Sequence, residues 1–172
     1  MFRDPGRPVR PVLPIWQENL REFEVPVAVL ARPDPGRPVL VARQAVDGFL
    51  NQLDVAYYDD DRTIAIQVTT HRPLPGHFRI TSDLSPSALL ADFLYNASPH
   101  GPVELPGEPL PSTGHLTVDG VTVPADRLVH GGYVVTSAAL QDVTIAVIST
   151  TGLHGQAVRL HRESAHPVTA AP

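Results

Sequence analysis

Apolar residues recur at helical spacing in three stretches of the chain, and each stretch predicts a short helix. The first covers residues 15–23, and the second covers residues 45–53, where apolar positions follow one another at intervals of one and three. The third begins at Ser85 and Pro86, because serine caps helices and proline suits the first helical position. The apolar face of this third helix consists of Leu89, Leu90, Phe93 and Leu94.

Stretches rich in β-branched residues are joined by turn residues, which predicts antiparallel hairpins. Residues 25–30 and 39–41 flank an Asp-Pro-Gly turn and are expected to pair. A second hairpin joins 54–58 to 63–70 through an acidic tip at 59–61. Further strands are expected at 77–81, at 143–148, at 157–160, and around the turns Asp119-Gly120 and Gly131-Gly132.

Taken together, these patterns predict an α+β fold with about three short helices, antiparallel hairpins and a C-terminal β-meander. The β-meander is short for an independent core, so we expect it to pack on the preceding part as one domain. The predicted segments are a proline-rich arm at 1–14, an α+β part at 15–96, a Pro/Gly-rich connection at 97–114, the β-meander at 115–161 and a flexible tail at 162–172.

Part of the predicted α+β region resembles a known unit. Helix 45–53, the tip Tyr57-Tyr58-Asp59-Asp60-Asp61 and the strand at 64–68 together resemble the helix-plus-hairpin unit of YbjN-like and type III secretion chaperone-like domains. The resemblance covers about a third of the chain and implies a non-enzymatic fold that binds partner proteins.

The composition excludes several kinds of chemistry. Lysine and cysteine are both absent, so the chain offers no lysine for a Schiff base or a P-loop, and no thiolate nucleophile or metal ligand. The net charge is −5 and the arginines are scattered, so we expect no nucleic-acid or membrane partner. No apolar run resembles a membrane span or a signal peptide, which predicts a cytoplasmic location.

Eight histidines are the remaining candidates for chemistry. His71 and His77 flank a Pro-rich turn, yet their spacing differs from standard zinc motifs. His130 precedes Gly131-Gly132, which resembles the start of an esterase oxyanion-hole motif, but the chain lacks the Gly-x-Ser-x-Gly nucleophile turn. We therefore expect no catalytic, cofactor-binding or metal-binding residues, and we retain His71, His77 and His130 as a candidate polar cluster.

These observations favour a non-catalytic protein-binding, adaptor or regulatory module whose partner is another protein or a second copy of the chain. The predicted partner surface comprises Tyr57, Tyr58, Val143 and Ile145, at an open β-edge near 143–148 or at the hairpin 57–68. The alternative is a small hydrolase or isomerase whose His and Asp residues converge only in three dimensions. A pocket that held two of His71, His77, His115 and His130 beside an aspartate would favour that enzyme.

Overall fold

The computed structural model describes residues 19–31, 38–43, 48–58, 63–76, 83–97, 103–153 and 157–161. In these ranges the chain is mostly β, and one nine-stranded sheet has the order β1-β9-β5-β6-β7-β8-β4-β3-β2. Its strands are β1 (Val27–Leu30), β2 (Pro38–Arg43), β3 (Gln52–Tyr58), β4 (Ile64–His71), β5 (Leu110–Val118), β6 (Val121–His130), β7 (Tyr133–Ala139), β8 (Thr144–Thr150) and β9 (Val158–His161).

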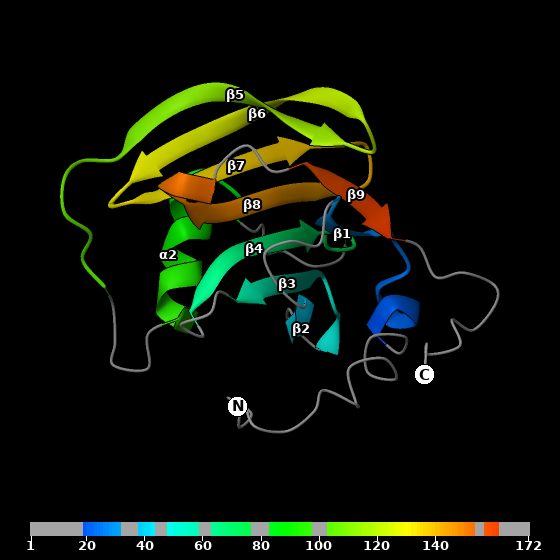
Figure 1. Cartoon of the computed structure of the whole chain (residues 1–172). Coiled ribbons are helices and arrows are strands. Elements are labelled where there is room, and N and C mark those ends of the chain that lie inside the picture. Colours follow the sequence, from blue (N-terminus) through cyan, green and yellow to red (C-terminus); the bar gives the residue numbers. More distant parts are fainter. Residues whose placement is uncertain are drawn as a thin grey trace, which may run out of the picture.

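The sheet curls into a barrel-like shape that is nearly closed, as Figure 1 shows. All neighbouring strands are antiparallel except β5 and β9, which meet in parallel at Val118 and Val158. The curl brings β1 against β4 and β3. There the backbone N–H of Ala28 donates to Thr70 Oγ1 at 2.8 Å, and that of Leu30 donates to the Tyr57 hydroxyl at 3.0 Å. Side chains therefore bridge this gap in place of a backbone ladder.

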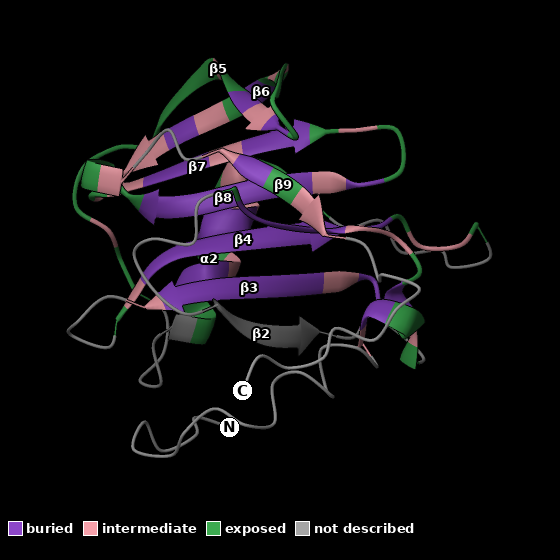
Figure 2. Ribbon diagram, turned by 45° about the vertical axis from the view of Figure 1, so that its right-hand side comes forward, coloured by how far each residue is buried: buried purple, intermediate pink, exposed green. Residues whose placement is uncertain are grey.

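The main core fills the inside of the curled sheet. Side chains of a strand alternate between its two faces, so Leu53, Val55 and Tyr57 of β3 point inward and join the core. Purple ribbon along β3, β4 and β8 marks this buried region in Figure 2. The largest fully buried side chains are Tyr57, Phe23, Leu30, Leu50, Leu53, Ile66, Ile145, Ile148, Val27, Val55, Val68 and Val135.

Helix α2 (Pro86–Ala97) covers part of the outer face of β6, β7 and β8. It begins as the sequence predicts, because Ser85 Oγ accepts a hydrogen bond from the N–H of Ala88 at 3.3 Å. Leu89, Leu90, Phe93 and Leu94 form a second apolar cluster with residues of β6, β7 and β8. The predicted third helix and its apolar face are thus confirmed.

The predicted α+β fold with about three helices is wrong. Residues 19–23 are helical and η2 (Thr151–Leu153) is a single 3-10 turn, so α2 is the one long helix in the described ranges. Within the predicted helix 45–53, residues 50 and 51 have no regular structure and β3 begins at Gln52. The apolar series continues through Val55 and Tyr57 at a period of two, which is the period of a strand. Residues 48–53, the described part of this predicted helix, therefore do not form the α-helix on which the resemblance rests.

Hairpins predicted from turn residues have mixed outcomes. The pairs β3–β4, β5–β6 and β6–β7 are confirmed, with φ of 49° at Asp119, 78° at Gly120, 55° at Gly131 and 85° at Gly132. The pairing of 25–30 with 39–41 is wrong, because β1 pairs with β9 and β2 pairs with β3.

One sheet runs across the predicted boundary at 97–114, and β5 already begins at Leu110 inside the predicted connection. The main core draws residues from both sides of that boundary. Outside the described residues lie the predicted arm 1–14, the acidic tip 59–61, the strand 77–81 and the tail 162–172.

Candidate functional site

A buried polar strip lies on the outer face of β3 and β4. Asp54 sits opposite Thr69, and its carboxylate accepts hydrogen bonds from Thr69 Oγ1 at 2.8 Å and from Gln52 Nε2 at 3.1 Å. Gln67 Nε2 in turn donates to Thr69 Oγ1 at 3.4 Å. The exposed fraction of Asp54 is 0 %. The Asp54 carboxylate thus provides acceptors for the buried side chains around it, and it is shielded from any substrate in solvent.

His71 extends this strip at the end of β4. Its Nε2 lies 2.9 Å from Asn51 Nδ2, and both side chains are buried. Burial lowers the pKa of His71, so the ring is neutral near pH 7. A neutral ring accepts the amide hydrogen bond at Nε2, which leaves that nitrogen occupied rather than ready to act as a base or a metal ligand.

Arg72, the next residue, ties the end of β4 to the helical turn at 19–23. Its Nε donates to the carbonyl of Leu50 at 2.7 Å, and Nη2 donates to the carbonyl of Glu22 at 3.2 Å. The guanidinium also stacks on Phe49 and Phe23, with 4.2 and 5.2 Å between its carbon and the ring centroids. These contacts give Arg72 a structural role, because they join the end of β4 to the helical turn.

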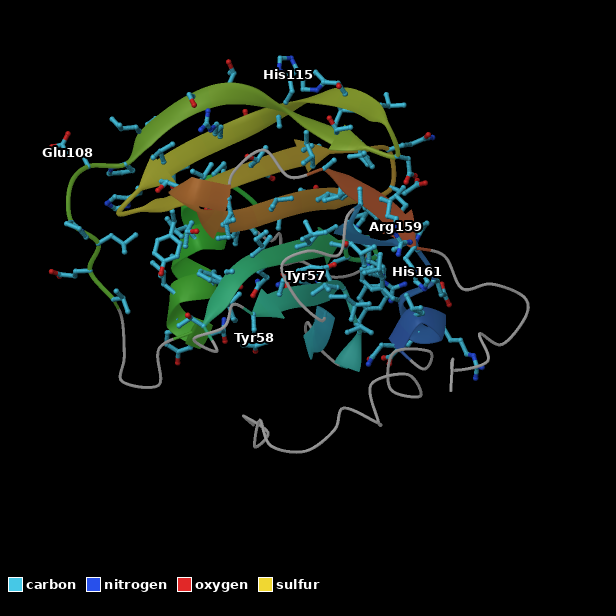
Figure 3. All side chains as sticks on the ribbon, viewed as in Figure 1. Tyr57, Tyr58, Glu108, His115, Arg159 and His161 are labelled. Atoms are coloured by element: carbon cyan, nitrogen blue, oxygen red, sulfur yellow. The ribbon has the colours of Figure 1, made fainter. Side chains whose placement is uncertain are left out.

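The three candidate histidines that the structure describes, His71, His115 and His130, are not brought together. His130 lies at the end of β6, where Nε2 is 3.0 Å from the carbonyl oxygen of Gly107. His115 projects from β5 at the top of the molecule (Figure 3), whereas His71 belongs to β4, three strands further along the sheet from β6. His77 lies outside the described residues. Among the residues that are described, no group of three His, Asp or Glu side chains is placed to hold a metal.

The turn after His130 has a packing role. A Cβ atom placed on Gly131 would lie 2.6 Å from Leu105 Cβ, so only glycine lets this turn approach Leu105. Gly131 also has a positive φ of 55°, which suits glycine.

Most of the predicted partner surface is buried. Exposed fractions are 2 % for Tyr57, 7 % for Val143 and 0 % for Ile145, and Tyr58 alone is partly exposed. The predicted open edge at 143–148 is wrong, because β8 pairs with β4 on one side and with β7 on the other. The hairpin β3–β4 is likewise enclosed, between β2 and β8. The apolar character of both faces of β8 reflects this central position.

An open edge does occur on β5, which forms the upper rim of the sheet in Figure 1. β5 pairs with β6 along its whole length, but on its other side it meets β9 only at Val118. Between Leu110 and Thr117, no other strand in the described part of the chain pairs with it. Most residues of this run are exposed, and none carries an acidic group or an arginine.

The turn defines which backbone groups of β5 point outward. A two-residue turn at Asp119 and Gly120 makes Val118 and Val121 a hydrogen-bonded pair, and such pairs alternate with pairs that exchange no hydrogen bonds. Thr113 and His115 belong to the second kind. Their N–H and C=O groups therefore point away from β6, toward the side where no described strand lies beside this part of β5.

The proline positions agree with this assignment. Pro111 lies opposite Leu128, and Pro124 lies opposite His115, so each proline occupies a pair that needs no N–H within the hairpin. Asp119 marks where the open run stops: its N–H donates to the carbonyl of Val158 at 3.0 Å, and its Oδ1 accepts from the N–H of Leu160 at 2.9 Å. The sequence contains two signals of this edge. Prolines occupy positions 111 and 124, and residues 110–117 include no acidic residue and no arginine.

Comparison with known proteins gives no relative: no protein-family model, curated protein or solved structure significantly resembles this chain. Within the ranges that the structure describes, no helix combines the length and the apolar character required to cross a membrane.

Proposed function

We propose that this protein is a non-catalytic binding module that takes up an extended polypeptide segment along the open edge of β5. The observation that carries the proposal is the run from Leu110 to Thr117. There Thr113 and His115 direct backbone N–H and C=O groups outward, and no strand among the described residues pairs with them. An added strand satisfies such groups, and main-chain hydrogen bonds then supply much of the affinity.

Two further observations support binding through this edge. Thr113 and His115 are exposed, so their outward groups can be reached without any rearrangement of the fold. The strand also lacks the charged side chains, lysine above all, with which proteins commonly protect open edges against pairing. Pro111 reduces the donors at one end and thereby restricts where a partner strand can sit.

The alternative function, a small hydrolase or isomerase, lacks a comparable observation. Asp54 and His71 lie on the paired strands β3 and β4, but both are buried and hydrogen-bonded to neighbouring side chains. The cytoplasmic location expected from the sequence stays a prediction.

The test places a unique crosslinking group on the edge. Because the chain has no cysteine, His115→Cys creates a single site for a photoreactive maleimide. In this background, Thr113→Pro removes one outward N–H, at a position of the kind that already holds Pro111. Thr122→Pro is the matched control, because Thr122 is also exposed and its N–H points away from β5, beyond the region where β6 pairs with β7.

We expect a defined crosslinked product that Thr113→Pro abolishes and Thr122→Pro preserves, with both variants melting cooperatively. Mass spectrometry of the product identifies the partner. If the product forms equally well in the Thr113→Pro chain, the partner does not use the β5 backbone and the proposed function is wrong.

A further inference from the structure

We infer that the strand added to β5 is β5 of a second copy of this chain, in an antiparallel pair about a two-fold axis at Gly114. This inference rests on the proposed edge binding and names its partner. The open run extends from Leu110 to Thr117, because β9 occupies the edge from Val118 onward. Gly114 lies at the middle of that run. A two-fold axis at Gly114 lets the open runs of the two copies pair with each other and form a joint between them. In each copy β9 stays at Val118, at the end of that joint.

The register about Gly114 satisfies the outward groups of both copies. It places Thr113 opposite the partner's His115, and His115 opposite the partner's Thr113. All four residues direct their N–H and C=O groups into the joint, so each opposed pair exchanges two hydrogen bonds, as antiparallel strands do. The proline that lacks a donor, Pro111, falls at the end of the joint rather than at its centre.

The centre of the joint contains the smallest side chains of the hairpin. Gly114 faces Gly114 of the partner subunit in a pair without hydrogen bonds, where antiparallel Cα atoms come closest, to about 4.5 Å. Behind each Gly114 lies Ala125, its neighbour on β6. A Cβ atom on Gly114 would meet Arg127 Cδ at 3.5 Å, an ordinary contact, so the position also accepts a small side chain.

The charges near the joint are compatible with two identical copies. The net charge of −5 disfavours self-association in general, but β5 itself carries no acidic residue or arginine. The register above places Asp126 in the same row as Thr113, the partner's His115 and the partner's Pro124. Arg127 falls in a different row, beside Ser112. Like charges therefore do not face each other across the axis, and the nearest ionisable side chain to Asp126 in its row is an imidazole.

A symmetric disulfide tests both the partner and the register. Gly114→Cys introduces the only thiol of the chain. In this register the Cα atoms of the two residues at position 114 are close enough for a disulfide to form. We expect mild oxidation to convert most of the protein to a species of twice the 18.6 kDa chain mass on non-reducing gels. Thr122→Cys, on the exposed far side of the same hairpin, should remain at the mass of one chain.

Sedimentation of the unmodified chain, over concentrations up to the high micromolar range, tests the association itself. We expect a monomer–dimer equilibrium. Thr113→Pro removes two hydrogen bonds per dimer and should weaken it roughly 10- to 100-fold, whereas Thr122→Pro should leave it unchanged.

Two results would overturn this inference. One is a single 18.6 kDa species at every concentration, and the other is a dimer in which Gly114→Cys forms no disulfide. The proposed function would survive either result if the crosslinking experiment captures a different protein in a manner that depends on Thr113. Loss of that dependence as well would remove both.

Discussion

Within the described part of the chain, strands β1 and β5 each have one side without a full strand neighbour, and these two sides differ. On β1, the N–H groups of Ala28 and Leu30 are covered by Thr70 Oγ1 and the Tyr57 hydroxyl. On β5, the equivalent groups of Thr113 and His115 face outward with no described strand beside them. All four residues of β1 are buried, whereas most of β5 between Leu110 and Thr117 is exposed.

Burial explains the difference. A buried N–H without a partner costs about 1–3 kcal/mol, so β1 requires acceptors from the inward faces of β4 and β3. An exposed N–H bonds to water at no such cost, and it can exchange that water for another strand. The β1 edge is thus an internal joint of the fold, and the β5 edge is available to a partner.

The largest expected effect comes from removing the acceptors at the closed edge. Tyr57→Phe and Thr70→Val each keep the shape of the side chain but leave one buried N–H unsatisfied. We expect each to lower the free energy of unfolding by about 1–3 kcal/mol, measured by denaturant titration. Thr113→Val, at the open edge, should change it by less than about 0.5 kcal/mol. Equal effects at the two edges would contradict the contrast between them.

An intermediate effect is expected from pH, through His71, which follows Thr70 on β4. Burial lowers the pKa of His71 below its ordinary value of 6.5, so the unfolded chain takes up this proton at a higher pH than the folded chain does. Stability is therefore full above pH 6.5, declines as the pH falls below that value, and levels off below the folded pKa. The slope from one group is at most about 1.4 kcal/mol per pH unit.

Variants are needed to isolate the contribution of His71, because burial and the nearby Arg159 also lower the pKa of His161. His71→Gln keeps an acceptor for Asn51 and should flatten the decline between neutral and acidic pH. Parallel profiles for the parent chain and His71→Gln would show that protonation of the buried His71 ring does not change the free energy of unfolding.

The smallest expected effect concerns the turn that leads into β1. Glu24 follows the helical residues 19–23 with a φ of 61°, a left-handed conformation that favours glycine. Glu24→Gly should raise the free energy of unfolding by up to about 1 kcal/mol, because glycine adopts this conformation without strain. The pair that is lost, between the exposed Glu24 carboxylate and the buried Arg72 at 3.9 Å, contributes little. Glu22→Gly, within the helical turn, should lower it by about 1 kcal/mol. Thermal melts that rank the two variants the other way would refute this.

Local features of this fold can be predicted from sequence, and long-range features cannot. Asp119-Gly120 and Gly131-Gly132 define their hairpins because a turn needs only its own backbone preferences. The pairing of Val27 with His161 has no such signal, because the partner strand lies at the other end of the described chain. The Asp-Pro-Gly sequence at Asp34 therefore suggested a hairpin between strands that pair elsewhere.

The candidate site was missed for a related reason. Apolar residues on both faces of β8 indicate a covered strand, and such a strand lies at the centre of a sheet rather than at its edge. The informative pattern was in β5, where exposed polar residues surround Pro111 and Gly114 without any charged side chain. Likewise, Leu50 and Leu53 fit the spacing of a helix in the sequence alone. The pairing of Gln52 and Asp54 with β4 shows that Leu53, Val55 and Tyr57 instead follow the alternation of a strand.

The pairing of β1 with β9 also orders the steps of folding during synthesis. Ribosomes make the chain from its N-terminus, so the apolar segment Val27–Leu30 emerges long before Val158–His161, the strand with which it pairs. Until then it can reach Thr70 and Tyr57 but has no strand to complete its ladder. Contacts so distant in sequence form slowly, because a long loop must close first. Closure of the sheet therefore belongs to the last stage of folding, and a chain stopped before β9 would leave this segment as an aggregation site.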